Sequence, residues 1–153
     1  MKNKRIIQIV NFLLSLFLGG LLVYGGISKF KSPSPSPTSQ IESYQKGELK
    51  TDDLPTLKIK NYVFGMKQTN FFWQFLGITE LLFGLLIISQ KFRLLGSILA
   101  LPIVINIFLF HLFLEPNEIG ELIEMLLLLI ANIWLIAYEY PKWKSILITK
   151  TIF

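Results

Sequence analysis

The side chains of this chain that could do chemistry are a few ionisable groups set in or beside long apolar stretches. Glu80 lies in the middle of one stretch, His111 near the end of another, and Glu124 near the start of a third. Lys29 directly follows the first stretch. Ionisable groups at membrane depth are costly and rare, and they commonly mark proton, ion or ligand sites. These residue types can pair charges, relay protons or hydrogen-bond a bound molecule.

These side chains can meet if the apolar stretches are helices of one bundle. At a rise of about 1.5 Å per residue, His111 and Glu124 would lie about 5–8 Å inside one boundary of the apolar layer, and Glu80 about 13 Å inside it. The long side chain of Lys29 could reach inward toward these carboxylates. We therefore expect one polar pocket at this boundary. Asn106 would lie at its edge, because it is about 140° from His111 around the helix.

A structural role for Glu80 is the alternative to a ligand or proton site. A buried carboxyl can pair with Lys29 or a backbone donor and so fix the register of packed helices. A neutral carboxyl that faces lipid is a third interpretation. The residue types and their spacing leave these three interpretations open.

Other chemistries have little support in the sequence. The chain has no cysteine, which excludes thiolate nucleophiles, disulfide exchange and cysteine-ligated metals. Its single histidine, His111, shares a helix face with Glu115, but metal-binding carboxylate bundles use a Glu-x-x-His element from two helices. No such element occurs here, so no metal site is predicted. Neither a nucleophile elbow nor a glycine-rich phosphate-binding loop is present.

Four apolar stretches, each bounded by charge, must position these residues. About 20 apolar helical residues cross a hydrocarbon core of about 30 Å, and stretches of this length occupy about residues 6–27, 71–89, 94–114 and 119–140. Only 16% of the chain is charged and 52% is hydrophobic, whereas soluble proteins carry about 25% charged residues. We predict a single all-α membrane domain over residues 1–153, folded as an up-down four-helix bundle.

The connections differ greatly in length. Residues 31–70 are mostly polar and include a Ser-Pro repeat, which should be extended because proline lacks a donor and fixes φ. We expect a long loop here that forms a partly ordered cap over one mouth of the bundle, with the Ser-Pro stretch mobile. The short links at 90–93 and 115–118 make the helices that they join antiparallel neighbours. Pro102 predicts a local kink in the third stretch.

Basic residues beside the stretches predict the orientation in the membrane. With four crossings, both termini and the 90–93 link lie on one side, and the 115–118 link on the other carries no basic residue. Because basic residues are enriched in cytoplasmic segments, we expect both termini in the cytoplasm and the long loop outside. The net charge of +5 is then a topology signal, and nucleic acid is not an expected partner. The basic residues of the cytoplasmic side are Lys2, Lys4, Arg5, Lys91, Arg93, Lys142, Lys144 and Lys150.

Three motifs resemble the DoxX family of small bacterial membrane proteins. Tyr24–Phe30, at the end of the first stretch, resembles the family's Gly-x-Ser-Lys-[Leu/Phe] ending. Gly77–Leu86, followed by Lys91–Arg93, is similar to the second helix and basic turn of the family. Asn106–Pro116 looks like the end of the third helix in one DoxX-like branch, which usually has Asp where this chain has Glu115. The order and spacing of the motifs together carry the resemblance.

The resemblance covers about residues 19–30 and 70–143, and it does not cover the Ser-Pro segment. It implies a four-helix bundle of the bacterial inner membrane, with Lys29, Glu80 and His111 as site candidates. Some DoxX-type proteins are associated with sulfur-compound oxidation that feeds electrons to quinone, or with membrane-anchored oxidoreductase complexes. Thiol-based chemistry of that kind could not reside in this cysteine-free chain.

Our first hypothesis is therefore an accessory or scaffold subunit of a membrane complex. It would have a polar pocket open to the extracytoplasmic side and would not be catalytic alone. Its partners would be the lipid bilayer and another membrane or membrane-associated protein, or else a second copy of the chain. The alternative is a subunit of a quinone-linked oxidoreductase, in which Glu80 and His111 hydrogen-bond a quinone and relay protons. A small transporter is a second alternative, less favoured because four spans without repeats seldom form one. Quinone is the only cofactor that these hypotheses suggest.

Overall fold

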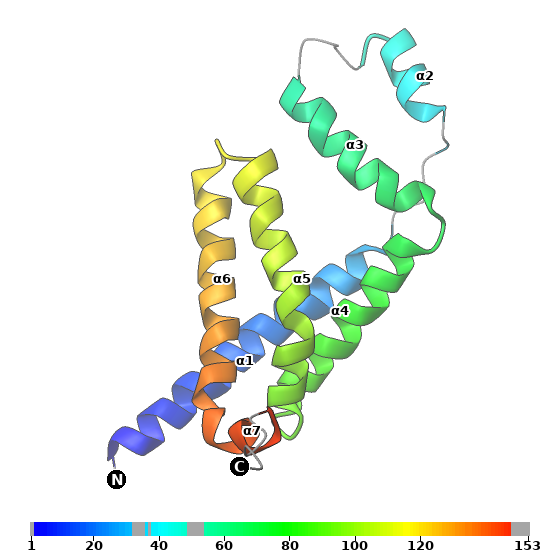
Figure 1. The fold of residues 1–153 in the computed structure, drawn as a ribbon. Coiled ribbons are helices and arrows are strands. Elements are labelled where there is room, and N and C mark those ends of the chain that lie inside the picture. The colour runs from blue at the N-terminus through cyan, green and yellow to red at the C-terminus, as the bar shows by residue number, and fades with distance from the viewer. Residues whose placement is uncertain (1, 32–35, 37, 49–53, 148–153) are drawn as a thin grey trace, which may run out of the picture.

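The computed structural model describes residues 2–31, 36, 38–48 and 54–147, and over these residues the chain is helical with no strand (Figure 1). The predicted all-α fold is thus confirmed. Most of the Ser-Pro segment lies outside the described residues. The helices are α1 (Lys2–Ser28), α2 (Ser39–Gln45), α3 (Leu54–Gln68), α4 (Phe72–Ile88), α5 (Arg93–Leu114), α6 (Ile119–Tyr138) and α7 (Tyr140–Leu147).

Three helices are long and apolar enough to cross a membrane, namely α1 over Lys4–Ser28, α5 and α6. The fourth predicted span corresponds to α4, which has 17 residues. α4 counts as a candidate membrane span only when it is taken together with α3, and the axes of these two helices are bent by 89° relative to each other. Many large apolar side chains of these helices are exposed, among them Phe17, Leu85 and Leu127. Such outward apolar surface is what helices that face lipid present.

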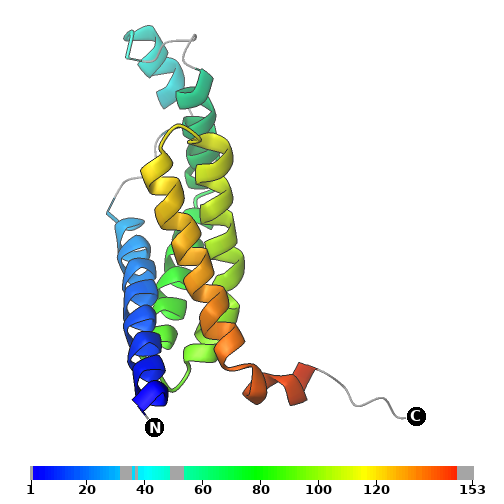
Figure 2. The ribbon, with the colours of Figure 1, turned by 90° about the vertical axis from the view of Figure 1, so that its left-hand side faces the viewer.

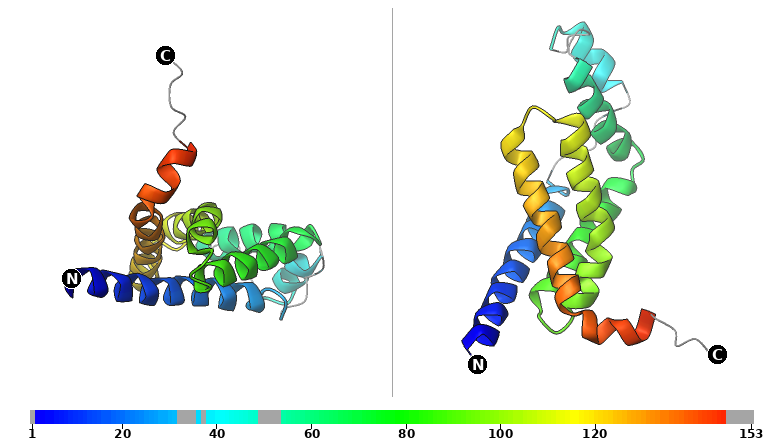
Figure 3. Two further views of the ribbon diagram at one scale, coloured as in Figure 1. Left: turned by 90° about the horizontal axis from the view of Figure 1, so that it is seen from below. Right: turned by 60° about the vertical axis from the view of Figure 1, so that its left-hand side comes forward.

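The long helices pack beside one another with the short helices at the two ends. α1 packs mainly against α4, and α5 packs against both α4 and α6 (Figure 3). The start of α1, the α4–α5 turn and α7 lie at one end of the bundle, which we call the terminal end (Figure 2). The end of α1, helix α3 and the α5–α6 turn lie toward the other, which we call the loop end (Figure 2). The core between the ends includes Leu18, Ile87, Val104 and Leu135.

Four glycines let the backbones of α1 and α4 come into contact. A Cβ atom on Gly84 would lie 2.7 Å from the carbonyl oxygen of Gly19, and one on Gly19 would lie 2.8 Å from that of Gly84. A Cβ atom on Gly26 would likewise lie 2.7 Å from the carbonyl oxygen of Gly77. The two pairs match in antiparallel order along the helices. Small residues at such positions allow the close approach that stabilises helix pairs in lipid.

The segment predicted as a polar loop, residues 31–70, contains two helices in the structure. α2 is short, whereas α3 lies across the loop end and contacts both α4 and α5. Asn70 follows α3 with φ of 61°, a left-handed conformation that asparagine adopts more readily than most residues. This residue turns the chain sharply into α4. The sequence predicted a partly ordered cap here but did not identify α3 as a helix, whose few apolar residues find a surface to cover.

Glu139 ties together three helices at the terminal end. It accepts a hydrogen bond from Arg93 at the start of α5, and Lys142 Nζ of α7 lies 2.5 Å from its Oε2. Burial raises the pKa of the Glu139 carboxyl, but the hydrogen bonds and charges of Lys142 and Arg93 outweigh that effect. The pKa of Glu139 therefore lies below its ordinary value.

We predict that Gly84→Ala destabilises the protein, because the added methyl group would meet the carbonyl oxygen of Gly19 at 2.7 Å and the Val23 side chain at 2.9 Å. Overpacking of this kind costs about 1–3 kcal/mol. Gly20→Ala is the matched control, since no atom lies within 4 Å of a Cβ built there. Thermal unfolding in detergent, followed by circular dichroism, should show a lower midpoint for Gly84→Ala only. Equal midpoints for the two variants would contradict the backbone contact.

We also predict that the stabilisation from Glu139 depends on pH. Because its pKa is lower in the folded than in the unfolded state, the carboxylate stabilises the fold fully above the unfolded value of about 4.3. That contribution is lost as the pH falls through the lowered folded value. Glu139→Gln should therefore unfold at a lower temperature than the wild type at about pH 7, and the difference should shrink toward about pH 3. The exposed Glu48→Gln should show little difference at either pH, and a constant difference for Glu139→Gln would contradict the ion pairs.

Candidate functional site

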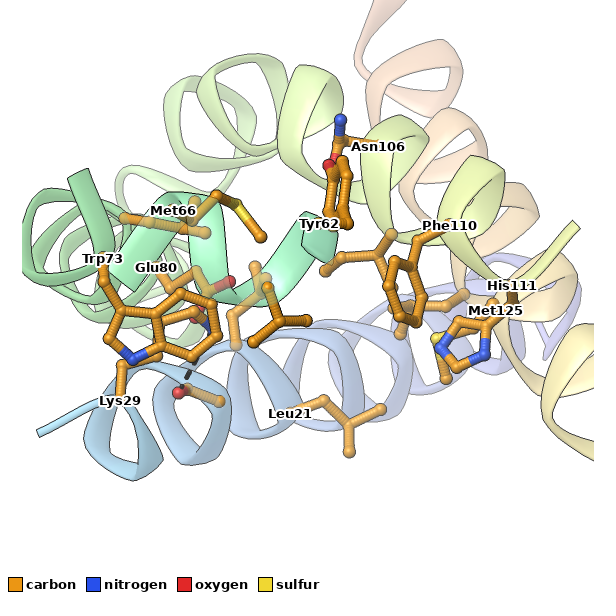
Figure 4. Close-up of a pocket in the computed structure, with 16 residues that line it drawn as sticks. Leu21, Lys29, Tyr62, Met66, Trp73, Glu80, Asn106, Phe110, His111 and Met125 are labelled. Carbon is orange, nitrogen blue, oxygen red and sulfur yellow. Dashed lines mark hydrogen bonds and ion pairs between the residues drawn. The ribbon is translucent and has the colours of Figure 1, made fainter. Parts of the chain in front are cut away.

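A cavity of about 340 Å³ lies in the loop half of the bundle (Figure 4). Its walls come from the end of α1, the start of α4, the last turns of α5 and the first turns of α6, and α3 covers it. Most lining side chains are apolar or aromatic, such as Leu21, Met66, Leu76 and Met125. The volume is in the range of small-molecule sites, which are also mainly apolar with a few placed polar groups.

Lys29 and Glu80 form an ion pair at one end of the cavity. Lys29 Nζ lies 2.5 Å from Glu80 Oε2 and also donates to the carbonyl oxygen of Gly25 at 3.5 Å. Glu80 is only 2% exposed. A Cβ atom on Gly25 would lie 3.3 Å from Glu80 Oε2, so the glycine leaves room for the carboxylate. The pair joins α1 to α4 and fixes a charged donor at the wall of an apolar space.

Trp73 stands beside this ion pair and receives two ammonium groups. The Nζ atoms of Lys29 and Lys67 lie 5.2 Å and 5.0 Å from the centre of its ring, distances typical of cation–π contacts. The indole Nε1 is buried and has no hydrogen-bond partner among the described residues. Trp73 therefore adds a flat aromatic wall and an unused donor to the Lys29–Glu80 end.

Tyr62 anchors α3, the helix that covers the cavity, to α5. The hydroxyl of Tyr62 donates to Asn106 Oδ1 of α5 at 2.9 Å, and its ring centre lies 5.6 Å from that of Phe110. Val63 and Met66 of α3 also line the cavity. These contacts place α3 over the space between α1 and α5.

His111 lines the cavity at the end away from the Lys29–Glu80 pair (Figure 4). Its Nδ1 atom lies 2.8 Å from Glu115 Oε2 and 3.5 Å from Glu121 Oε2. Nδ1 thus faces the two carboxylates, which leaves Nε2 as the ring nitrogen for a ligand. The cavity therefore has an apolar middle with hydrogen-bonding groups at its two ends.

The structure brings together four of the five site residues named from the sequence. Lys29, Glu80, Asn106 and His111 line the one cavity, whereas Glu124 is exposed and does not line it. The neighbouring Met125 faces the cavity instead, because successive helical residues point about 100° apart. The pocket expected from the sequence was polar, but the observed lining is largely apolar.

Sequence reasoning missed the aromatic residues Tyr62 and Trp73. For Tyr62 a signal existed, since Ile59, Tyr62, Val63 and Met66 recur at the spacing of one helix face. The charged residues between them concealed this period. For Trp73 no such signal exists, because its place at the cavity depends on how α3 folds back over α4.

Comparison of the chain with protein-family models, with curated proteins and with solved structures finds no match. The resemblance to the DoxX family therefore stays a prediction. The function is to be argued from the cavity and the residues around it.

We predict that Lys29 and Glu80 stabilise the fold as a coupled pair. Lys29→Met leaves the buried Glu80 carboxyl without its partner, a change that typically costs about 3–5 kcal/mol. The double variant Lys29→Met with Glu80→Gln should lose less than the sum of the single variants, by about 1–3 kcal/mol. Unfolding midpoints in detergent measure the cycle, with the exposed Lys58→Met as control. Additive losses would contradict the pairing.

Proposed function

We propose that the chain is a four-span protein of the bacterial cytoplasmic membrane, with both termini in the cytoplasm. Three helices of sufficient length and apolarity support the membrane location. With its 17 residues, α4 would be about 25 Å long, and local thinning of the bilayer accommodates such a short span. The start of α1, the α4–α5 turn and α7 share one end of the bundle (Figure 2), and their basic residues favour the cytoplasm for that end. The resemblance to the DoxX family is in accord with a bacterial membrane.

Within this membrane, the function we propose is to bind a small amphipathic molecule in the cavity at the loop end. The observation that carries the proposal is the cavity of about 340 Å³, apolar in its middle and with hydrogen-bonding groups at both ends. Lys29 Nζ and Trp73 Nε1 offer donors at one end, and His111 offers Nε2 at the other. A molecule dissolved in the membrane would exchange one apolar environment for another and gain these polar contacts.

Binding without catalysis is the role that the lining residues support best. Among the described residues that line the cavity there is no serine or threonine hydroxyl, and the Lys29 amine is held in an ion pair with Glu80. Glu80 is engaged by Lys29 and is not free to act as a base. We therefore propose an accessory subunit that holds its ligand for a partner protein of the same membrane.

A quinone is the ligand class that fits these features best, and a subunit of a quinone-linked oxidoreductase is accordingly the second candidate function. A quinone is flat, apolar around its ring and carries two carbonyl acceptors on opposite sides. The rings of Trp73 and Phe110 offer flat contact surfaces, while Lys29 and His111 supply donors at opposite ends of the cavity.

Reduction of a quinone to a quinol takes up two electrons and two protons. The electrons would come from the partner, and His111 with its carboxylates would supply protons.

We predict that the purified chain binds a water-soluble short-chain quinone and that Glu80→Gln weakens binding at least about tenfold. The physical reason is that Glu80 holds the Lys29 ammonium at the cavity wall, and a hydrogen bond from a charged donor contributes about 1.5–3 kcal/mol. Glu124→Gln makes the same chemical change outside the cavity and should bind as the wild type does. Titration calorimetry in detergent measures the affinities.

Two outcomes would contradict these proposals. If the wild type binds no quinone, the quinone-linked function is wrong, and a lipid-like ligand remains to be tried. If the chain alone reduces the quinone with NADH as electron donor, the accessory role is wrong. Equal affinities for Glu80→Gln and Glu124→Gln would remove Glu80 from the site.

A further inference from the structure

A second group of chemically capable side chains lies at the turn between α5 and α6. His111 comes from the last turn of α5, Glu115 is the residue that caps the end of that helix, and Glu121 comes from the first turn of α6. One nitrogen or oxygen atom from each of these side chains lies within 4.8 Å of the others. No metal site was predicted here, because the chain has a single histidine, no cysteine and no Glu-x-x-His element. The third side chain arrives only when the chain folds back on itself.

The fold holds the three side chains in place without help from a ligand. His111 and Glu115 are four residues apart on α5 and therefore lie on one helix face. After Glu115, the amide of Glu118 donates to the Glu115 carbonyl at 3.1 Å, and the amide of Leu122 donates to the Glu118 carbonyl at 3.0 Å. These bonds close the turn and start α6, so that Glu121 points back over the histidine.

The distances around His111 Nδ1 are those between neighbouring ligands of one metal ion. Ligand atoms about 2.1 Å from a common ion lie about 3.0 Å apart in octahedral and about 3.4 Å apart in tetrahedral geometry. The observed separations from Nδ1 are 2.8 Å to Glu115 Oε2 and 3.5 Å to Glu121 Oε2. An ion could therefore be accommodated with small movements of the side chains.

No lysine or arginine among the described residues neutralises the two carboxylates of this cluster. Nδ1 is buried, and despite the nearby carboxylate it makes no well-directed hydrogen bond to any described residue. In the part of the chain that the structure describes, neither carboxylate has an ion pair with a lysine or arginine. Two carboxylates that converge on one point repel each other unless a positive charge lies between them.

We propose that His111, Glu115 and Glu121 bind one divalent transition-metal ion, of the Zn²⁺ or Mn²⁺ class. An imidazole with two carboxylates suits these ions, whereas Ca²⁺ takes oxygen ligands alone. The three protein ligands leave positions for water, so the site would be an open one. With Nδ1 on the ion, the proton of the ring resides on Nε2. The ion would therefore fix His111 as a hydrogen-bond donor to the cavity that the ring lines.

The test is titration of the chelator-treated full chain in detergent with ZnCl₂, MnCl₂ and CaCl₂. We expect one Zn²⁺ or Mn²⁺ ion per chain, a higher unfolding temperature with the ion, and Ca²⁺ binding at least about tenfold weaker. Glu121→Gln and Glu115→Gln should each weaken Zn²⁺ binding at least about tenfold. Glu124→Gln, one turn further along α6 and exposed, is the matched control and should bind as the wild type does.

Several results would overturn the proposal. Absence of Zn²⁺ and Mn²⁺ binding by the wild type would leave the cluster as hydrogen-bonded side chains only. Equal affinities for Ca²⁺ and Zn²⁺, or equal loss in Glu124→Gln, would mean diffuse attraction by acidic residues. Unchanged Zn²⁺ binding by both Glu121→Gln and Glu115→Gln would place the ion elsewhere. The Glu121 side chain is 58% exposed, so Glu121→Gln should unfold at the wild-type temperature in the absence of metal. If Glu121→Gln is destabilised, Glu115→Gln takes its place in the test.

Discussion

The contact between the backbones of α1 and α4 at their four glycines is the constraint on which the rest of the structure depends. It brings the two helices close enough for Lys29 to reach Glu80 past Gly25, whose missing side chain leaves space for the carboxylate. A larger residue at Gly19 or Gly84 would push the helices apart and lengthen that ion pair. The wall of the cavity formed by α1 and α4 would move with them. Packing of small residues therefore positions the charged groups.

Hydrogen bonds across the bundle lie in its terminal half, whereas the proposed ligand cavity lies in its loop half. In the terminal half, two buried side chains of α1 accept hydrogen bonds from other parts of the bundle. Trp134 Nε1 of α6 donates to Asn11 Oδ1 at 2.8 Å, and Gln90 Nε2 of the α4–α5 turn donates to Ser15 Oγ at 2.6 Å. Interhelical hydrogen bonds of this kind contribute to helix association in lipid. In the loop half the helices separate around the cavity, and their polar groups point to its ends.

The long apolar helices and their order could be predicted from the sequence, because length and hydropathy are properties of each segment alone. Depth along a helix could be predicted as well, since the rise per residue is constant, and it placed Lys29 near Glu80. The direction in which a side chain points depends on how its helix is rotated against its neighbours, which is why Glu124 was assigned to the cavity and Met125 was not. Helix α3 was missed for a related reason. Its apolar face is present in the spacing of Ile59, Tyr62, Val63 and Met66, but the charged residues between them conceal it until there is a surface for it to cover.

The cover of the cavity has a further consequence. α3 is bent by 89° from α4, and its direction is set at the left-handed Asn70, while its hold on α5 comes mainly from Tyr62. The position of α3 above the cavity is thus determined by the backbone conformation at Asn70 rather than by the size of the residues that line the cavity. A related chain could bind a larger ligand through a change at this turn alone, with all the residues that line the cavity unchanged.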